Sequence, residues 1–260
     1  MRVGPYKGES VLEGEIMLRS YLCEERNGFR VYCAEYDLTF ARTTARAIET
    51  AGASLTAYFE VSSLPRIRAV LAPDRDRFDA LVADLLRVQI ERPSDPRRIA
   101  QPQRGDIVLL SPSAYAEHSS YEYVPDDYRR MISHELVHVL QEQLSPNIEE
   151  SPLWWDEGLA VYLSEQWRTA SQFCFREQVL RDVRSKRIPA LAAAFSDPSL
   201  AYSFGWTLVR FLEQEHGREA IVAAVKNVSD GNVLAALGEN PASLEESWQA
   251  WLRNTVGREA

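Results

Sequence analysis

The sequence predicts an α+β protein with a small mixed sheet, a pair of helices that carries the candidate site, and a mostly helical C-terminal part. Three observations predict this class. Strand-type segments rich in β-branched and aromatic residues occur only before residue 111. Apolar residues at helical spacing dominate from residue 125 onward. A hydrophobic content of 45% and a charged content of 26% are typical of a globular chain with a large core.

The first half of the chain alternates strand patterns with helical ones. The expected elements are strands at residues 11–23 and 29–36, a helix at 38–59, a strand at 65–71 and a helix at 74–90. Asn27-Gly28 is a turn signal between the first two strands. A polar, proline-bearing segment spans residues 91–104, and the apolar run Ile107–Leu110 follows it.

Two helices carry the candidate site. The first covers residues 125–144, because Pro125-Asp126-Asp127 suits a first turn and Ser145-Pro146 ends the pattern. The second covers Trp155–Trp167. Further helices are expected at residues 173–187, 202–216, 220–228, 233–237 and 244–256. The chain therefore divides into a strand-rich extension (1–37), a sheet-and-helix part (38–145) and a helical part (146–260).

Charge and composition exclude several classes of protein. The formal net charge of −9 argues against nucleic-acid binding, which needs a basic face. No stretch approaches the ~20 apolar residues that cross a bilayer. The first residues lack the apolar core of a secretion signal. Three cysteines cannot all pair within one chain, so we expect a reducing, cytoplasmic location.

The pentad His134-Glu135-Leu136-Val137-His138 is the strongest motif in the chain. A random chain of this composition would contain about 0.006 such pentads. Residues four apart share one helix face, so both imidazoles can bind one metal ion, and Glu135 can act as a general base on a water there. The alternatives are two core histidines that only form hydrogen bonds, and a structural zinc site, which would favour four Cys or His ligands.

Glu157 follows the pentad after eighteen residues and is the predicted third ligand. It lies in an apolar frame that starts with Trp154-Trp155, and a buried carboxylate there needs a partner such as a metal ion. Glu149 and Glu150 are rival ligands on the intervening loop. Gly158 costs helix stability, and we expect it to allow close approach to the metal-bearing helix.

These residues resemble the gluzincin metallopeptidases, the group that includes thermolysin and the alanyl-aminopeptidase-like enzymes. The resemblance rests on the pentad, the eighteen-residue gap and the stretch from Trp154 to Ala160. The segment 201–217 is similar to the peptidase MA-like and minigluzincin branch, in which a tyrosine opens a helix. The likeness runs from about Phe29 to Trp251 and implies a zincin-like fold with a thermolysin-like catalytic core.

The resemblance implies a role for each matching residue. His134, His138 and Glu157 would bind one Zn²⁺ per chain, and Glu135 would be the catalytic base. Asp156 would orient a ligand histidine. Tyr202 would donate a hydrogen bond to the oxyanion, with Tyr162 as a competitor. The run Ile107–Leu110 would form the sheet edge along which a peptide or protein substrate lies; an ordinary interior strand is the alternative.

Two departures narrow the expected activity. Aminopeptidases of this group carry a Gly-x-Met-Glu-Asn string that grips the amino terminus of the substrate, and residues 106–112 contain no such string. We therefore expect an endopeptidase. Thermolysin-like enzymes have an Asp four residues after the glutamate ligand, where this chain has Val161. Support for His134 must then come from elsewhere, such as a backbone carbonyl. A catalytically silent binding module and a zinc hydrolase with a non-peptide substrate remain as alternative functions.

Overall fold

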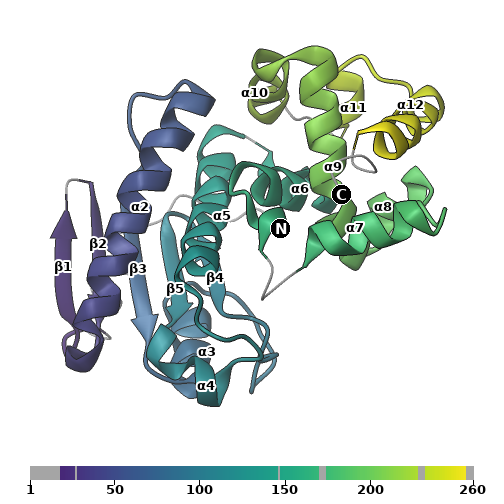
Figure 1. Cartoon of the computed structure of the whole chain (residues 1–260). Coiled ribbons are helices and arrows are strands. Elements are labelled where there is room, and N and C mark those ends of the chain that lie inside the picture. The colour runs from purple at the N-terminus through teal and green to yellow at the C-terminus, as the bar shows by residue number, and fades with distance from the viewer. Residues whose placement is uncertain (1–17, 27, 146, 170–173, 228–231, 256–260) are drawn as a thin grey trace. The chain divides into compact units, whose positions relative to one another are not determined.

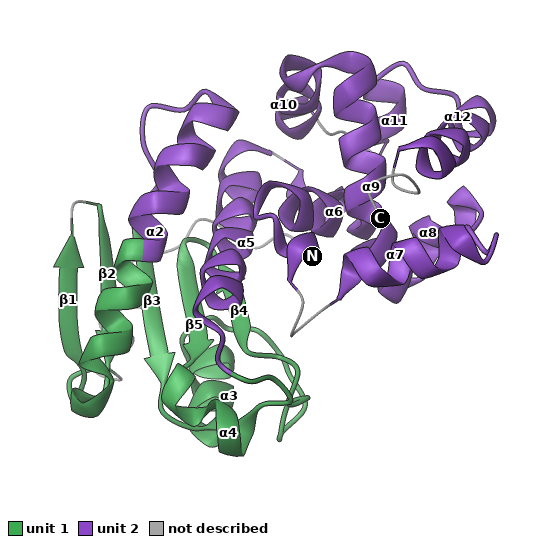
Figure 2. Ribbon diagram, in the orientation of Figure 1, with its two compact units in different colours: residues 1–46, 66–122 green, residues 47–65, 123–260 purple. Residues whose placement is uncertain are grey.

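The computed structural model describes residues 18–26, 28–145, 147–169, 174–227 and 232–255 (Figure 1). The chain divides into two compact units, coloured in Figure 2. Unit 1 comprises residues 1–46 and 66–122, and unit 2 comprises residues 47–65 and 123–260. Helix α2 (Leu38–Phe59) contributes residues to both. The predicted α+β class is confirmed, because the sheet lies in unit 1 and unit 2 is helical.

Unit 1 is built on a five-stranded mixed sheet of order β1-β2-β3-β5-β4. Its strands are β1 (Leu22–Arg26), β2 (Phe29–Cys33), β3 (Ile67–Ala72), β4 (Ala100–Gln103) and β5 (Asp106–Leu110). The central pairs β2–β3 and β3–β5 are parallel, and both outer pairs are antiparallel. Strands β3 and β5 are mostly apolar and largely buried, as expected of strands covered on both faces, and α3 (Arg75–Asp84) packs against them. A short helix, α4 (Tyr115–His118), completes the unit.

The predicted sheet edge at Ile107–Leu110 is wrong. Strand β5 is interior, with β3 on one side and β4 on the other. The edge strand next to it is β4, which lies in the polar, proline-bearing segment of residues 91–104, and β1 forms the opposite edge. The β4 residues Ala-Gln-Pro-Gln have low β propensity, so the pairing of this strand depends on the turn that follows. That turn is a two-residue loop in which Arg104 (φ 50°) and Gly105 (φ 80°) both adopt the left-handed conformation of a type I′ hairpin.

Unit 2 is a helical assembly around α9. In addition to part of α2, this unit contains α5 (Pro125–Leu144), α6 (Leu153–Leu163), α7 (Phe175–Arg184), α8 (Leu191–Ser196), α9 (Pro198–His216), α10 (Arg218–Asn227), α11 (Val233–Ala236) and α12 (Pro241–Asn254). Helices α6, α7, α8, α10 and α12 all pack on α9. In this core the indole rings of Trp167 and Trp206 stack with their centroids 4.8 Å apart. The indole N–H of Trp248 donates a hydrogen bond to the Thr207 hydroxyl.

Gly158 does not serve the predicted contact with the metal-bearing helix. It faces Gly205, so that α6 and α9 touch through their backbones. A Cβ on Gly158 would lie 2.6 Å from the carbonyl carbon of Gly205, and one on Gly205 would lie 2.6 Å from the carbonyl oxygen of Trp154. Only glycine at both positions permits this approach.

Several predicted boundaries shift in the structure. The helix expected at 74–90 ends at Asp84, before Arg87 adopts φ 60°. The helix expected to reach Trp167 ends at Leu163, before Glu165 adopts φ 55°. Helix α9 begins at Pro198, so Tyr202 lies in its second turn and does not open it. The short helix α8 was not predicted.

The first predicted strand falls largely outside the description. Its residues 11–17 and the turn residue Asn27 lie outside the described residues, and β1 starts at Leu22. Within the described residues, no helix is both long and apolar enough to cross a bilayer.

Candidate metal centre

Helix α5 holds the two histidines rigidly. Val124 precedes it in an extended conformation, Pro125 occupies its first turn, and the carboxylate of Asp127 pairs with Arg130 at 3.2 Å. The four-residue spacing places His134 and His138 on one face, with ring centroids 4.7 Å apart. Their Nε2 atoms lie 3.0 Å from each other.

Helix α6 brings the third predicted residue to the same point. Oε2 of Glu157 lies 3.3 Å from Nε2 of His134 and 3.3 Å from Nε2 of His138. The rival carboxylates Glu149 and Glu150 are exposed in a 3-10 turn, and neither belongs to this group. Of the three carboxylates that the sequence offered, the structure groups Glu157 with the histidines.

The geometry and chemistry of these atoms fit zinc. Two ligands about 2.0–2.1 Å from a tetrahedral zinc ion lie about 3.3–3.4 Å apart, close to the observed 3.0, 3.3 and 3.3 Å. Oε2 of Glu157 is buried and accepts no hydrogen bond from any described residue, although both rings are near. Two imidazole nitrogens and one carboxylate oxygen form a donor set that zinc prefers, and they leave a fourth position open.

The charges of these groups are strongly coupled. Burial alone would raise the pKa of Glu157, but the imidazoles of His138 and His134 hold it well below its usual range. Burial alone would lower the pKa of His138, but Glu157 raises it to about 9. The buried carboxylate of Glu157 therefore favours a positive charge close to it, and either a proton or a metal ion supplies that charge.

Glu135 is not one of the three converging groups. It is buried next to His134, with 7% of its surface exposed. Burial raises the pKa of Glu135, and the neighbouring imidazoles of His134 and His138 oppose that shift. A carboxyl group whose pKa moves toward neutrality suits proton transfer in both directions.

The structure shows a hydrogen-bond network that sequence reasoning missed. The Oε1 atom of Gln141, one turn after His138, accepts a hydrogen bond from Nδ1 of that imidazole at 2.9 Å. Its Nε2 donates to the backbone carbonyl of Asp156 at 3.2 Å. The carboxylate of Asp156 accepts a hydrogen bond from the Ser151 hydroxyl. The only sign of this network in the sequence was a polar residue, Gln141, at the third position after the pentad.

The first histidine lacks the support that the sequence led us to expect. Nδ1 of His134 is buried and has no hydrogen-bond partner among the described residues, so no backbone carbonyl of that part of the chain fills the role. Val161, at the position of the thermolysin-like Asp, is fully buried and apolar.

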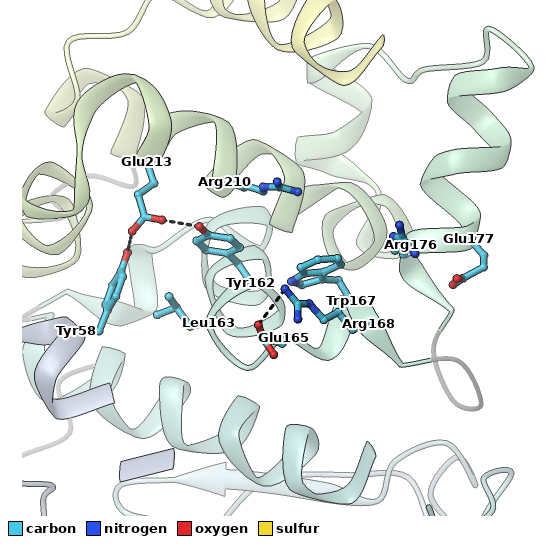
Figure 3. A pocket seen from close by; sticks show the side chains of 10 residues that line it. All are labelled: Tyr58, Tyr162, Leu163, Glu165, Trp167, Arg168, Arg176, Glu177, Arg210 and Glu213. Carbon is cyan, nitrogen blue, oxygen red and sulfur yellow. Dashed lines mark hydrogen bonds and ion pairs between the residues drawn. The ribbon is translucent and has the colours of Figure 1, made fainter. Parts of the chain in front are cut away.

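Of the two candidate oxyanion donors, Tyr162 is committed elsewhere. Its hydroxyl donates to Oε2 of Glu213 at 2.5 Å, and the Tyr58 hydroxyl donates to Oε1 at 2.6 Å (Figure 3). These side chains line a cavity of about 910 Å³ whose described lining includes none of the three candidate ligands. Tyr202 is half-buried and stacks on Phe175 at 6.2 Å, and its role at the oxyanion stays a prediction.

The Tyr58–Glu213–Tyr162 cluster predicts a loss of stability at alkaline pH. Burial and the hydrogen bonds to Glu213 raise the pKa of both phenols. The unfolded chain therefore releases these protons first, and the free energy of unfolding falls as pH rises above about 10. Urea unfolding between pH 8 and 12 measures the slope, which should be shallower in Tyr58→Phe. Equal slopes would contradict the role of Glu213 in holding the phenols protonated.

A comparison with protein-family models places part of the chain in a known superfamily. The family model of the peptidase MA superfamily matches residues 122–254, which include both helices of the candidate metal centre and every later helix to the last residue of α12. No curated protein matches the chain.

Proposed function

The chain belongs to the peptidase MA superfamily, and we propose that it is a zinc-dependent endopeptidase. One observation carries this proposal: His134, His138 and Glu157 converge on one point, and the carboxyl group of Glu135 is buried beside the first of them. A superfamily member without catalytic activity has no need of a base at that position.

The proposed mechanism assigns one task to each side chain. His134, His138 and Glu157 would hold the zinc ion, which when bound supplies a Lewis acid and lowers the pKa of a water to about 7. Glu135 accepts a proton from the attacking water and passes it to the leaving nitrogen. Tyr202 donates a hydrogen bond to the oxyanion that develops on the substrate carbonyl.

The pairing of Asp106 with Arg68 supports endopeptidase action. Asp106 is the only acid in segment 106–112, where related aminopeptidases bind the amino group of the substrate. Its carboxylate forms a two-point pair with the guanidinium of Arg68, at 2.9 and 2.5 Å. The carboxylate is therefore already neutralised and gives no support to recognition of a free amino terminus.

Zinc content and peptide cleavage test the proposal together. We expect one zinc per chain by elemental analysis and cleavage of internally quenched peptides that are blocked at both ends. A chelator should remove the cleavage, and added zinc should restore it. His134→Ala should lose zinc, whereas His216→Ala should keep it, because His216 pairs with Glu239 at 2.6 Å and not with the centre.

The possible failures point to different functions. Zinc binding without cleavage of any peptide would favour a silent binding module or a hydrolase with a non-peptide substrate. A purified protein that neither holds zinc nor takes it up would refute the metal centre itself.

A further inference from the structure

We propose that Gln141 is the positioning residue of the metal centre, because its single side-chain amide fixes the ring of His138 and ties α5 to α6. This inference rests on the proposed function, since it takes His138 and Glu157 as zinc ligands. The Gln141 side chain is almost wholly buried, with 1% of the residue exposed, so both ends of its amide need partners within the protein.

One end of the amide sets the protonation pattern of His138. Oε1 of Gln141 can only accept a hydrogen bond, so Nδ1 of His138, 2.9 Å away, carries the proton. In the neutral imidazole, Nε2 then has its lone pair available, and it is the atom that faces Nε2 of His134 and Oε2 of Glu157. Gln141 therefore selects both the tautomer and the orientation that metal binding requires.

The other end of the amide fixes α6. Nε2 of Gln141 donates to the backbone carbonyl of Asp156 at 3.2 Å, and Asp156 immediately precedes Glu157. The same side chain thus holds a ligand on one helix and the backbone next to a ligand on the other. Groups that orient metal ligands in this way typically account for a 10–100-fold difference in metal affinity.

The carboxylate of Asp156 has a smaller part in this network than the sequence predicted. Its Oδ1 lies 3.5 Å from Nε2 of Gln141, at the outer limit of a hydrogen bond, and Oδ1 already accepts from the Ser151 hydroxyl. The contact that matters is the backbone carbonyl, which no substitution of the Asp156 side chain removes. Asp156→Asn should therefore be mild where loss of Gln141 is severe.

A purely structural role for Gln141 makes a different prediction. If the side chain only filled space, Gln141→Met would preserve its volume and leave zinc affinity unchanged, whatever it did to the stability of the metal-free protein. A positioning role predicts weaker zinc binding in a protein that is still folded. Metal affinity, measured apart from catalysis, separates the two readings.

The test measures zinc affinity by competition with a chromophoric chelator, with folding of each metal-free protein checked by circular dichroism. We expect Gln141→Met to bind zinc about 10–100-fold more weakly than the wild type, and Asp156→Asn to stay within about threefold. Gln143→Met, at an exposed position of the same helix, is the matched control and should bind as the wild type does. The visible absorption of the Co²⁺-substituted protein should change in Gln141→Met alone.

The outcomes distinguish failure of the positioning role from failure of the proposed function. Wild-type affinity in Gln141→Met, or an equal loss in Asp156→Asn, would overturn the positioning role. If Gln141→Met fails to fold, Gln141→Asn keeps a polar amide but shortens its reach, and wild-type affinity in that variant would overturn the role equally. Absence of zinc binding by the wild type would instead refute the proposed function. Peptidase activity is not needed for any of these readings.

Discussion

Replacement of Glu135 by glutamine is expected to lower kcat/KM for a quenched peptide by about 10²–10⁴-fold, the usual contribution of a general base. Glutamine has nearly the same shape but does not accept a proton at neutral pH. Glu135 is not among the three groups that converge at the metal centre, so the variant should retain one zinc per chain. Steady-state cleavage and elemental analysis of the same preparation measure the two quantities.

Glu149→Gln is the matched control for this prediction. It makes the same chemical change at an exposed carboxylate that the sequence offered as a rival ligand, and it should keep both zinc and activity. Full turnover by Glu135→Gln would assign the base to another group. Loss of zinc together with activity would make Glu135 part of the metal-holding structure and leave its role in proton transfer without support.

The relative placement of the two histidines was predictable from local sequence. Four-residue spacing on a helical pattern is enough to place His134 and His138 on one face, and the structure agrees. Glu157 was predictable for a different reason, because a carboxylate in an apolar frame needs a partner. Both arguments use only the physics of a short segment.

Most of the contacts that sequence reasoning missed join distant segments. The partner of Gln141 on α6 is a backbone carbonyl, and because every residue has one, the sequence does not indicate which carbonyl is used. The hydroxyl of Tyr162 donates a hydrogen bond to Glu213, which lies 51 residues later on another helix. Strand β4 was missed because its residues have little β propensity and a turn of two left-handed residues imposes the pairing.

Gly158→Ala is expected to destabilise the protein by about 3 kcal/mol, at the upper end of the usual cost of overpacking. Helix propensity alone predicts the opposite, a gain of about 1 kcal/mol. The new methyl carbon would lie 2.6 Å from the backbone of Gly205, and a backbone in the middle of α9 cannot rotate away as a side chain can. Thermal unfolding of the metal-free protein measures the loss, with Tm falling by roughly 2–4 °C per kcal/mol.

Gly52→Ala separates this steric cost from any general effect of alanine. It makes the same substitution inside α2, where the added carbon would meet side-chain atoms and no backbone, namely Cγ of Leu64 at 3.2 Å and its terminal Cδ1, which can rotate away, at 2.4 Å. We expect it to change the free energy of unfolding by less than about 1 kcal/mol, because the gain in helix propensity offsets a small adjustment of Leu64. Gly158→Ala should also weaken zinc binding, since α6 must move away from α9 and Glu157 is the preceding residue. A Gly158→Ala protein as stable as the wild type would show that the two helices separate without cost, and the contact between their backbones would then have no part in holding the third ligand in place.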